Sequence, residues 1–215
     1  EYTDAPRAQA RTLGIPISPS SLFPRGPDPE TYFSHALSFR ERCAQAFAPV
    51  APFDERVGEV LAGLAGDVHV ELALDADGRP YGAMTIRNLP VEGGLPPHCE
   101  NQYLGIEVYD PIRADVQLER AIGFFVPLQV PDRGGQLVVY DEAFAEGARP
   151  FADRPLEVVE QVPHAELDAG PGDLVLVCAG NWFHQVTKIL GERSRWTIGG
   201  FGAFSRDDER FVIWA

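Results

Sequence analysis

The sequence predicts a mainly β protein, a jelly roll of two Greek keys or a related sandwich, with two helices near the N-terminus packed on the sheet. Two observations predict this fold. Eight or more short apolar segments, separated by Gly, Pro and Asp turns, follow one another after residue 68. Two earlier segments carry apolar residues at helical spacing. The 21 glycines and 19 prolines suit a turn-rich protein of this kind.

The N-terminal third is expected to hold an arm and two helices. Residues 1–27 are rich in Pro and Ser and predict an extended arm laid across the protein. Asp28-Pro29 is typical of a capped helix start and predicts a helix over 29–47. A second helical pattern begins near Asp54 and ends at Gly66. We therefore expect one domain over residues 1–215, with helices in 28–66 and the jelly roll in 68–215.

Alternating or continuous apolar runs predict the strands that follow. Asp77-Gly78 is a hairpin turn signal between the first two strands. Residues 105–119 are polar and irregular and suit a flap or a connecting segment, and 141–156 predict a long loop, a candidate lid. The expected strands are 69–74, 81–89, the segment around His98, 122–130, 134–140, 156–162, 173–177, 182–189, 193–204 and 210–214.

The composition argues against several classes of partner. The net charge of −14 disfavours nucleic acid and anionic membrane surfaces, since both would repel the protein. No apolar run is long enough to span a bilayer. Three widely spaced cysteines make neither a zinc pattern nor a disulfide framework, which favours a cytoplasmic location.

Two segments carry residues that could form one metal site. Residues two apart in a strand point to the same face, so His98 and Glu100 are expected to project together, and His184 on a later strand supplies a third ligand. Two imidazoles and one carboxylate on one face of a metal are typical of non-haem Fe(II) oxygenases. His164-Ala165-Glu166 has the same spacing, but it lies so close to His184 in the sequence that few strands can intervene. We assign it to a connecting strand at the surface.

Four segments together resemble the Fe(II)/2-oxoglutarate-dependent dioxygenase superfamily, and its prolyl-hydroxylase-type members in the C-terminal part. The resemblance covers residues 81–204. It implies a double-stranded β-helix, the cupin-like jelly roll, with Fe(II) held by His98, Glu100 and His184 and with 2-oxoglutarate and O2 as cosubstrates. The segments are His98 with Glu100, Gly134-Gly135-Gln136-Leu137, Gly172-Asp173-Leu174-Val175-Leu176, and His184-Gln185-Val186-Thr187 with Gly191-Glu192-Arg193.

The resemblance also implies a basic residue on the last core strand that binds the far carboxylate of 2-oxoglutarate. A guanidinium suits this task because its planar fork matches a carboxylate. Arg193 is the first choice, and Arg195 and Thr197 share the face on which Arg193 is expected. Candidate substrate-binding residues are Arg87, Gln102 and Trp182.

The expected activity is hydroxylation of an unactivated C–H bond of a small molecule, an amino acid or a natural-product intermediate, with release of succinate and CO2. Desaturation or ring closure would use the same residues. Halogenases of this superfamily have Gly or Ala in place of the carboxylate ligand, so Glu100 disfavours halogenation. Three alternatives remain: a hydroxylase acting on a protein side chain, a non-catalytic metal-binding jelly roll, and a cupin-type metalloenzyme that does not use 2-oxoglutarate.

Overall fold

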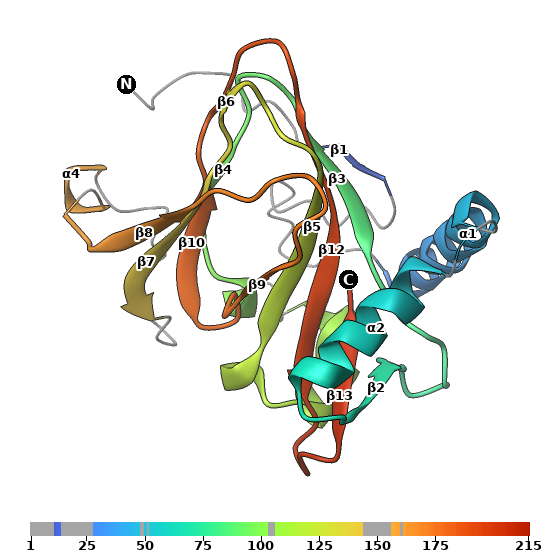
Figure 1. Ribbon diagram of the computed structural model, residues 1–215. Coiled ribbons are helices and arrows are strands. Elements are labelled where there is room, and N and C mark those ends of the chain that lie inside the picture. Colours follow the sequence, from blue (N-terminus) through green and yellow to red (C-terminus); the bar gives the residue numbers. More distant parts are fainter. Residues whose placement is uncertain are drawn as a thin grey trace.

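Two β-sheets face each other, and two helices cover one end of the larger sheet (Figure 1). The computed structural model describes residues 11–13, 28–47, 50, 52–102, 106–143, 156–159 and 161–215. Within these residues the strands form a seven-stranded sheet, a four-stranded sheet and a two-stranded ribbon. This is the mainly β, cupin-like jelly roll that the sequence predicts.

The larger sheet is built around β12 (Arg195–Phe204), which is long enough to pair with three other strands. On one edge it pairs first with β3 and then with β13, and on the other edge with β5. The neighbours of β12 are β3 (Thr85–Leu89), β5 (Ile122–Gln129) and β13 (Arg210–Trp214); farther out lie β1 (Arg11–Leu13), β2 (His69–Leu72) and β9 (Val175–Val177).

The smaller sheet has the order β4-β10-β7-β8, and its ribbon pairs β11 with β6. At Gly134 in β6 a side chain is impossible, because φ is +70° and a Cβ atom would lie 1.9 Å from the Lys188 carbonyl oxygen. This explains the Gly-Gly pair at the start of the predicted strand. The bounds are β4 (Leu95–His98), β6 (Arg133–Gly134), β7 (Leu137–Ala143), β8 (His164–Leu167), β10 (Trp182–Val186) and β11 (Ile189–Leu190).

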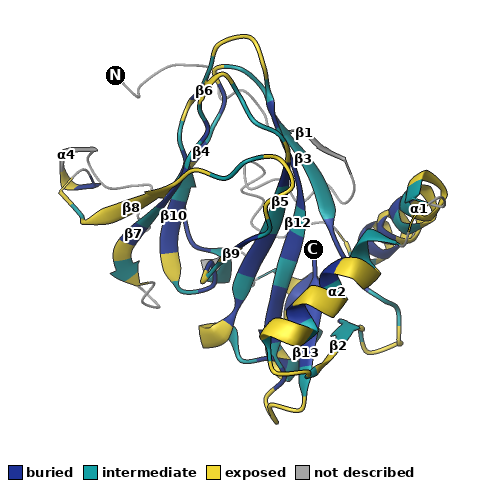
Figure 2. Cartoon of the chain, in the orientation of Figure 1, coloured by how far each residue is buried: buried dark blue, intermediate teal, exposed yellow. Residues whose placement is uncertain are grey.

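Helices α1 (Pro29–Phe47) and α2 (Phe53–Leu64) lie where the sequence predicts them, with their buried faces toward the sheet (Figure 2). In α2, Val57 and Leu61 belong to the same buried cluster as Phe211 and Ile213 of β13. In α1, the Tyr32 hydroxyl is buried and donates a 2.5 Å hydrogen bond to the carbonyl of Ala215. The apolar faces of both helices are therefore buried, as their helical periodicity predicts.

Residues 106–120 form a connecting segment between β4 and β5, one of the two roles that the sequence suggested, but the segment is not irregular. It contains η2 (Glu107–Tyr109), α3 (Asp110–Asp115) and η3 (Leu118–Arg120). Val108, Tyr109, Ile112 and Val116 are buried, because these short helices turn their few apolar side chains toward α1 and β13. The segment is thus part of the core.

Three further expected segments differ from the structure or lie partly outside the described residues. Within the segment 156–162, predicted as a strand, Leu156–Val159 form a helical turn, α4, in which Val159 packs against the smaller sheet. Most of the expected lid lies outside the described residues, since residues 144–155 are not described. Of the arm predicted for residues 1–27, Arg11–Leu13 pair with β3, and the remainder also lies outside the described residues.

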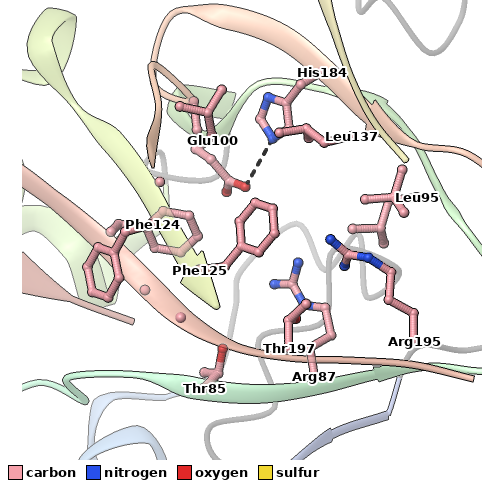
Figure 3. Close-up of a pocket in the computed structure, with 17 residues that line it drawn as sticks. Thr85, Arg87, Leu95, Glu100, Phe124, Phe125, Leu137, His184, Arg195 and Thr197 are labelled. Carbon is pink, nitrogen blue, oxygen red and sulfur yellow. Dashed lines mark ion pairs between the residues drawn. The ribbon is translucent and has the colours of Figure 1, made fainter. Parts of the chain in front are cut away.

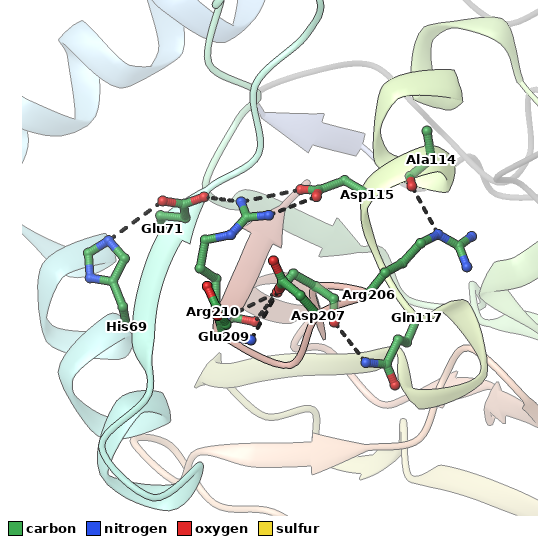
Figure 4. Close-up of polar contacts among 10 residues, drawn as sticks. His69, Glu71, Ala114, Asp115, Gln117, Arg206, Asp207, Glu209 and Arg210 are labelled. Carbon is green, nitrogen blue, oxygen red and sulfur yellow. Dashed lines mark hydrogen bonds and ion pairs between the residues drawn. The ribbon is translucent and has the colours of Figure 1, made fainter.

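Arg210 joins three parts of the fold that are distant in sequence (Figure 4). Its guanidinium donates to Glu71 of β2 at 2.5 Å and to Asp115 at the end of α3 at 2.8 Å. These bonds to Glu71 and Asp115 raise the pKa of Arg210. On the same turn, Arg206 donates to the Ala114 carbonyl at 2.9 Å, so the β12–β13 hairpin is fixed to α3. No helix among the described residues is long and apolar enough to cross a membrane.

Candidate metal and cosubstrate site

His98, Glu100 and His184 come together between the two sheets. His98 ends β4 and His184 lies on β10, and the two are direct Cα partners in the antiparallel pair. Each of the three residues offers one potential ligand atom, and these three atoms lie within 4.8 Å of one another. Glu100 Oε1 lies 3.5 Å from His98 Nε2 and 3.8 Å from His184 Nε2. The three predicted ligands therefore converge on one point.

Both imidazoles are held in the orientation that metal binding requires. The Nδ1 atom of His98 lies 2.7 Å from the Pro96 carbonyl oxygen, and that of His184 lies 3.0 Å from the Trp182 carbonyl oxygen. A carbonyl oxygen can only accept, so in each ring Nδ1 is the donor, and Nε2 is the atom left to face a metal. Burial and the neighbouring His184 lower the pKa of His98, which keeps its ring neutral. Two rings that donate through Nδ1 and turn Nε2 inward fit a divalent metal.

Glu100 reaches the site by a route that differs from the predicted one. Strand β4 ends at His98, and Glu100 begins a 3-10 turn, η1 (Glu100–Gln102), instead of continuing an extended strand. Its backbone N–H donates to the Ala179 carbonyl at 3.0 Å, which fixes the turn. Burial opposes ionisation, but contacts with His184 and His98 outweigh it and hold the pKa of Glu100 well below its usual range. The carboxylate is therefore charged at neutral pH, as a ligand for Fe(II) must be.

Two asparagines tie the segment of Glu100 to the loop that leads to His184. Asn101 Nδ2 donates to Asn181 Oδ1 at 3.1 Å, and Asn181 Nδ2 donates to the Glu119 carbonyl at 2.7 Å. The Cys99 thiol donates to the Gly180 carbonyl in the same region. The ligand-bearing turns are thus fastened to each other and to η3, independently of any metal.

A cavity with about 610 Å³ of empty space extends from Glu100 and His184 to the larger sheet (Figure 3). On that far side lie Arg195 and Thr197 of β12 and Arg87 of β3. Arg195 is 7% exposed, and its guanidinium lies over the ring of Phe125 at 5.1 Å. Burial and the charge of Arg87 lower the pKa of Arg195 to about 10, so it stays protonated at neutral pH.

This end of the cavity fits a carboxylate. Among the described residues, the Arg195 side chain forms neither an ion pair nor a hydrogen bond with a protein group, so its fork is available. Thr197 is buried beside it and adds a hydroxyl donor. One cavity therefore joins two of the three residues that could hold a metal, Glu100 and His184, to a buried cationic end.

Residues 13–215 match the model of a protein family described as the carrier-protein-independent halogenase WelO5. The chain belongs to this family. The match confirms the resemblance to the Fe(II)/2-oxoglutarate superfamily, and Fe(II) and 2-oxoglutarate are the cofactors expected from it. No curated protein matches the chain.

Solved structures share the fold of this WelO5-family chain at low sequence identity. An N-substituted L-amino acid dioxygenase from Burkholderia ambifaria AMMD is 14% identical, with a TM-score of 0.54, over 96% of this chain and 86% of that one. Another structure of such a dioxygenase from the same organism, in complex with α-ketoglutarate (2-oxoglutarate), is 16% identical, with a TM-score of 0.52, over 89% and 74% of the two chains. At these identities the likeness shows a common fold.

Arg193, the first choice for the cosubstrate from sequence, does not reach the cavity of this WelO5-family chain. It precedes β12, and its side chain is 58% exposed. Asp132 accepts its Nε–H at 2.6 Å and the backbone N–H groups of Glu192 and Arg193. The turn at Gly191 sends Arg193 outward, so the inward face of the strand begins at Arg195.

The remaining predicted residues divide between the cavity and the surface. Arg87 lines the cavity. Trp182 is 37% exposed and does not line it, because the pairing of β10 with β7 is irregular between Trp182 and His184. Gln102 has its backbone in η1, but its side chain lies outside the described part of the chain. His164, on the exposed edge strand β8, lies apart from the metal group, as predicted.

Sequence reasoning missed two groups of residues in the site. Phe125 and Thr85 line the cavity, but an apolar strand residue and a lone Thr carry no signal of their own. Asn101 and Asn181 were also missed, although each lies close in sequence to a predicted ligand. Polar residues next to ligands are the usual second layer of a metal site and were the available clue.

Proposed function

We propose that this protein is an Fe(II)- and 2-oxoglutarate-dependent oxygenase that hydroxylates a C–H bond of a small molecule, and that one domain, residues 1–215, carries the activity. The observation that supports this most is a single cavity with Glu100 and His184, which lie together with His98, at one end and the buried Arg195 at the other. A binding module has no need of a buried cation in the same cavity as a metal site.

The residues would divide the work as follows. His98, Glu100 and His184 would hold Fe(II) on one face and leave the opposite positions open. Arg195, with Thr197, would bind the far carboxylate of 2-oxoglutarate and so aim its 2-oxo acid end at the metal. When bound, the metal and 2-oxoglutarate supply the oxidation, in which O2 is consumed and succinate and CO2 are released. The protein positions the reactants and limits access of water.

Glu100 separates hydroxylation from halogenation in this proposal. The matching family is named for a halogenase, and superfamily halogenases have Gly or Ala where Glu100 stands, which leaves a metal position for the halide. Here that position has a buried carboxylate that is ionised and turned toward both imidazoles. We therefore propose that a halide finds no ligand position and that the product is hydroxylated.

We propose a free small molecule as substrate, an amino acid derivative or a natural-product intermediate. The family description calls its halogenase carrier-protein-independent, and the structural neighbours are named for N-substituted L-amino acids. A cytoplasmic location remains part of the proposal. A protein side chain is the second candidate substrate.

The test is anaerobic. Fe(II) is added to the metal-free protein, followed by 2-oxoglutarate, and the visible charge-transfer band of the chelated 2-oxo acid is measured. We expect a band that saturates, survives in Arg193→Ala and is lost or needs far more 2-oxoglutarate in Arg195→Ala. Metal binding without a band in the unaltered protein would contradict the proposal and favour a binding module or a cupin-type enzyme.

A further inference from the structure

Arg87 faces Arg195 and Thr197 across neighbouring strands. β3 and β12 are antiparallel, and Arg87 is the direct Cα partner of Thr197, while Arg195 pairs with Leu89 two residues farther along β3. In Figure 3 the guanidinium groups of Arg87 and Arg195 both point into the cavity, on the side opposite Glu100 and His184. Three donors from two strands therefore surround one end of the cavity.

Arg195 is buried and Arg87 is half-buried, and two positive charges at one end of a cavity are unfavourable unless an anion lies with them. Within the described residues, neither guanidinium has a carboxylate partner, and Arg87 Nε is buried with no hydrogen-bond partner. The charge of Arg87 also destabilises the protonated form of Arg195. The like-charged pair and the unmatched N–H group indicate that a ligand with oxygen acceptors belongs between them.

We propose that Arg87 is a second anchor for 2-oxoglutarate, so that Arg87, Arg195 and Thr197 together hold its far carboxylate. This inference rests on the proposed function and replaces the substrate-binding role that the sequence suggested for Arg87. A single carboxylate between the two guanidinium groups offsets both charges at once. A substrate carboxylate on Arg87 would instead stand close to the cosubstrate carboxylate on Arg195 and would be repelled by it.

The role predicts selectivity for oxo acids with a second carboxylate. The probes are 2-oxoglutarate and 2-oxopentanoate, which has the same carbon chain without the far carboxylate. The Kd of each is measured anaerobically from the charge-transfer band in the Fe(II)-loaded protein, for the unaltered chain and for Arg87→Met and Arg87→Lys. Arg193→Met, an arginine outside the cavity, is the matched control.

We expect Arg87→Met to raise the Kd for 2-oxoglutarate about ten- to a hundredfold, which is the usual effect of losing a charge-assisted hydrogen bond. The Kd for 2-oxopentanoate should change by no more than about twofold. Arg87→Lys, which keeps the charge but loses the fork, should fall between. Without metal, Arg87→Met should melt no lower than the unaltered protein, because it removes one of two like charges. Arg193→Met should bind both probes normally.

Two results would overturn the inference. An unchanged Kd for 2-oxoglutarate in Arg87→Met would favour the earlier interpretation, in which Arg87 binds the substrate. An equal loss for both probes would mean that Arg87 acts on the shape of the cavity and not on the far carboxylate. If Arg87→Met fails to fold, the same two criteria apply to Arg87→Lys. Absence of 2-oxoglutarate binding by the unaltered protein would instead contradict the proposed function itself.

Discussion

His98 and His184 are cross-strand partners whose ring centroids lie 4.3 Å apart, and each ring bonds through Nδ1 to the carbonyl two residues before it in its own strand. The same kind of hydrogen bond thus fixes both imidazoles, and in each case the accepting carbonyl belongs to the strand that carries the histidine. Because neither bond depends on the metal, the rings are oriented before a metal binds.

We expect His98→Ala or His184→Ala to lower Fe(II) affinity by at least about a hundredfold, since even residues that only support metal ligands contribute about ten- to a hundredfold. Calorimetric titration with Fe(II) under anaerobic conditions measures this. His164→Ala is the control, because His164 shares the His-x-Glu pattern but lies on the exposed strand β8. An equal loss of Fe(II) affinity in all three variants would contradict the assignment of His98 and His184 as metal ligands.

Glu100→Ala should convert the metal site into one that accepts a halide. Removing the carboxylate leaves two imidazole ligands and opens a position on their side of the metal. We expect chloride to shift the charge-transfer band of the Fe(II)/2-oxoglutarate complex in Glu100→Ala and to leave the unaltered protein unchanged. A chloride-dependent shift in the unaltered protein would count against hydroxylation.

Asp132 gives the stability a defined dependence on pH. Hydrogen bonds from the Glu192 N–H and from Arg193 lower the pKa of Asp132 from 3.8 to about 2. The folded state therefore binds this proton less readily than the unfolded state, so the stabilisation is complete above the unfolded value and is lost as the pH falls toward 2. Chemical denaturation across this range should show Asp132→Asn less stable near pH 5 and nearly equal at the acid end. A constant difference would contradict the assignment.

Asn181→Ala should weaken the metal site without removing a ligand. It deletes the hydrogen bonds to Asn101 and to the Glu119 carbonyl that fasten the loop before His184. We expect Fe(II) affinity to fall about tenfold, at the low end of what second-layer partners contribute. Cys178→Ser, an exposed change in the same loop, should bind Fe(II) normally. Unaltered affinity in Asn181→Ala would show that the loop is held by its backbone alone.

The convergence of His98, Glu100 and His184 could be predicted because their residue types and order are visible in the sequence. The choice between Arg193 and Arg195 could not, because it depends on where a strand begins. The Asp132 side chain accepts hydrogen bonds from two backbone N–H groups of the turn that precedes β12. This contact between residues distant in sequence holds Arg193 outside the cavity. The 3-10 turn at Glu100 could not be predicted for a similar reason. It is fixed by a hydrogen bond to the carbonyl of Ala179, which lies far away in the sequence.

The fold shows the same division. Helices α1 and α2 were predicted because periodic apolar residues and an N-terminal Asp-Pro are local signals. The segment from Ile106 to Arg120 was misjudged because its helices are too short to show a period. Their burial is decided by α1 and β13, which lie far away in the sequence.

The position of β13 has a consequence for how the protein is made. β13 lies between β12 and β2, pairs with β2 in parallel, and supplies the surface on which α2 packs. Glu71 is synthesised 139 residues before Arg210, its partner on this strand. During translation α2 and β2 therefore lack part of their partner surface until residues 210–214 leave the ribosome. The packing of α2 is in this sense completed by a strand that is synthesised much later.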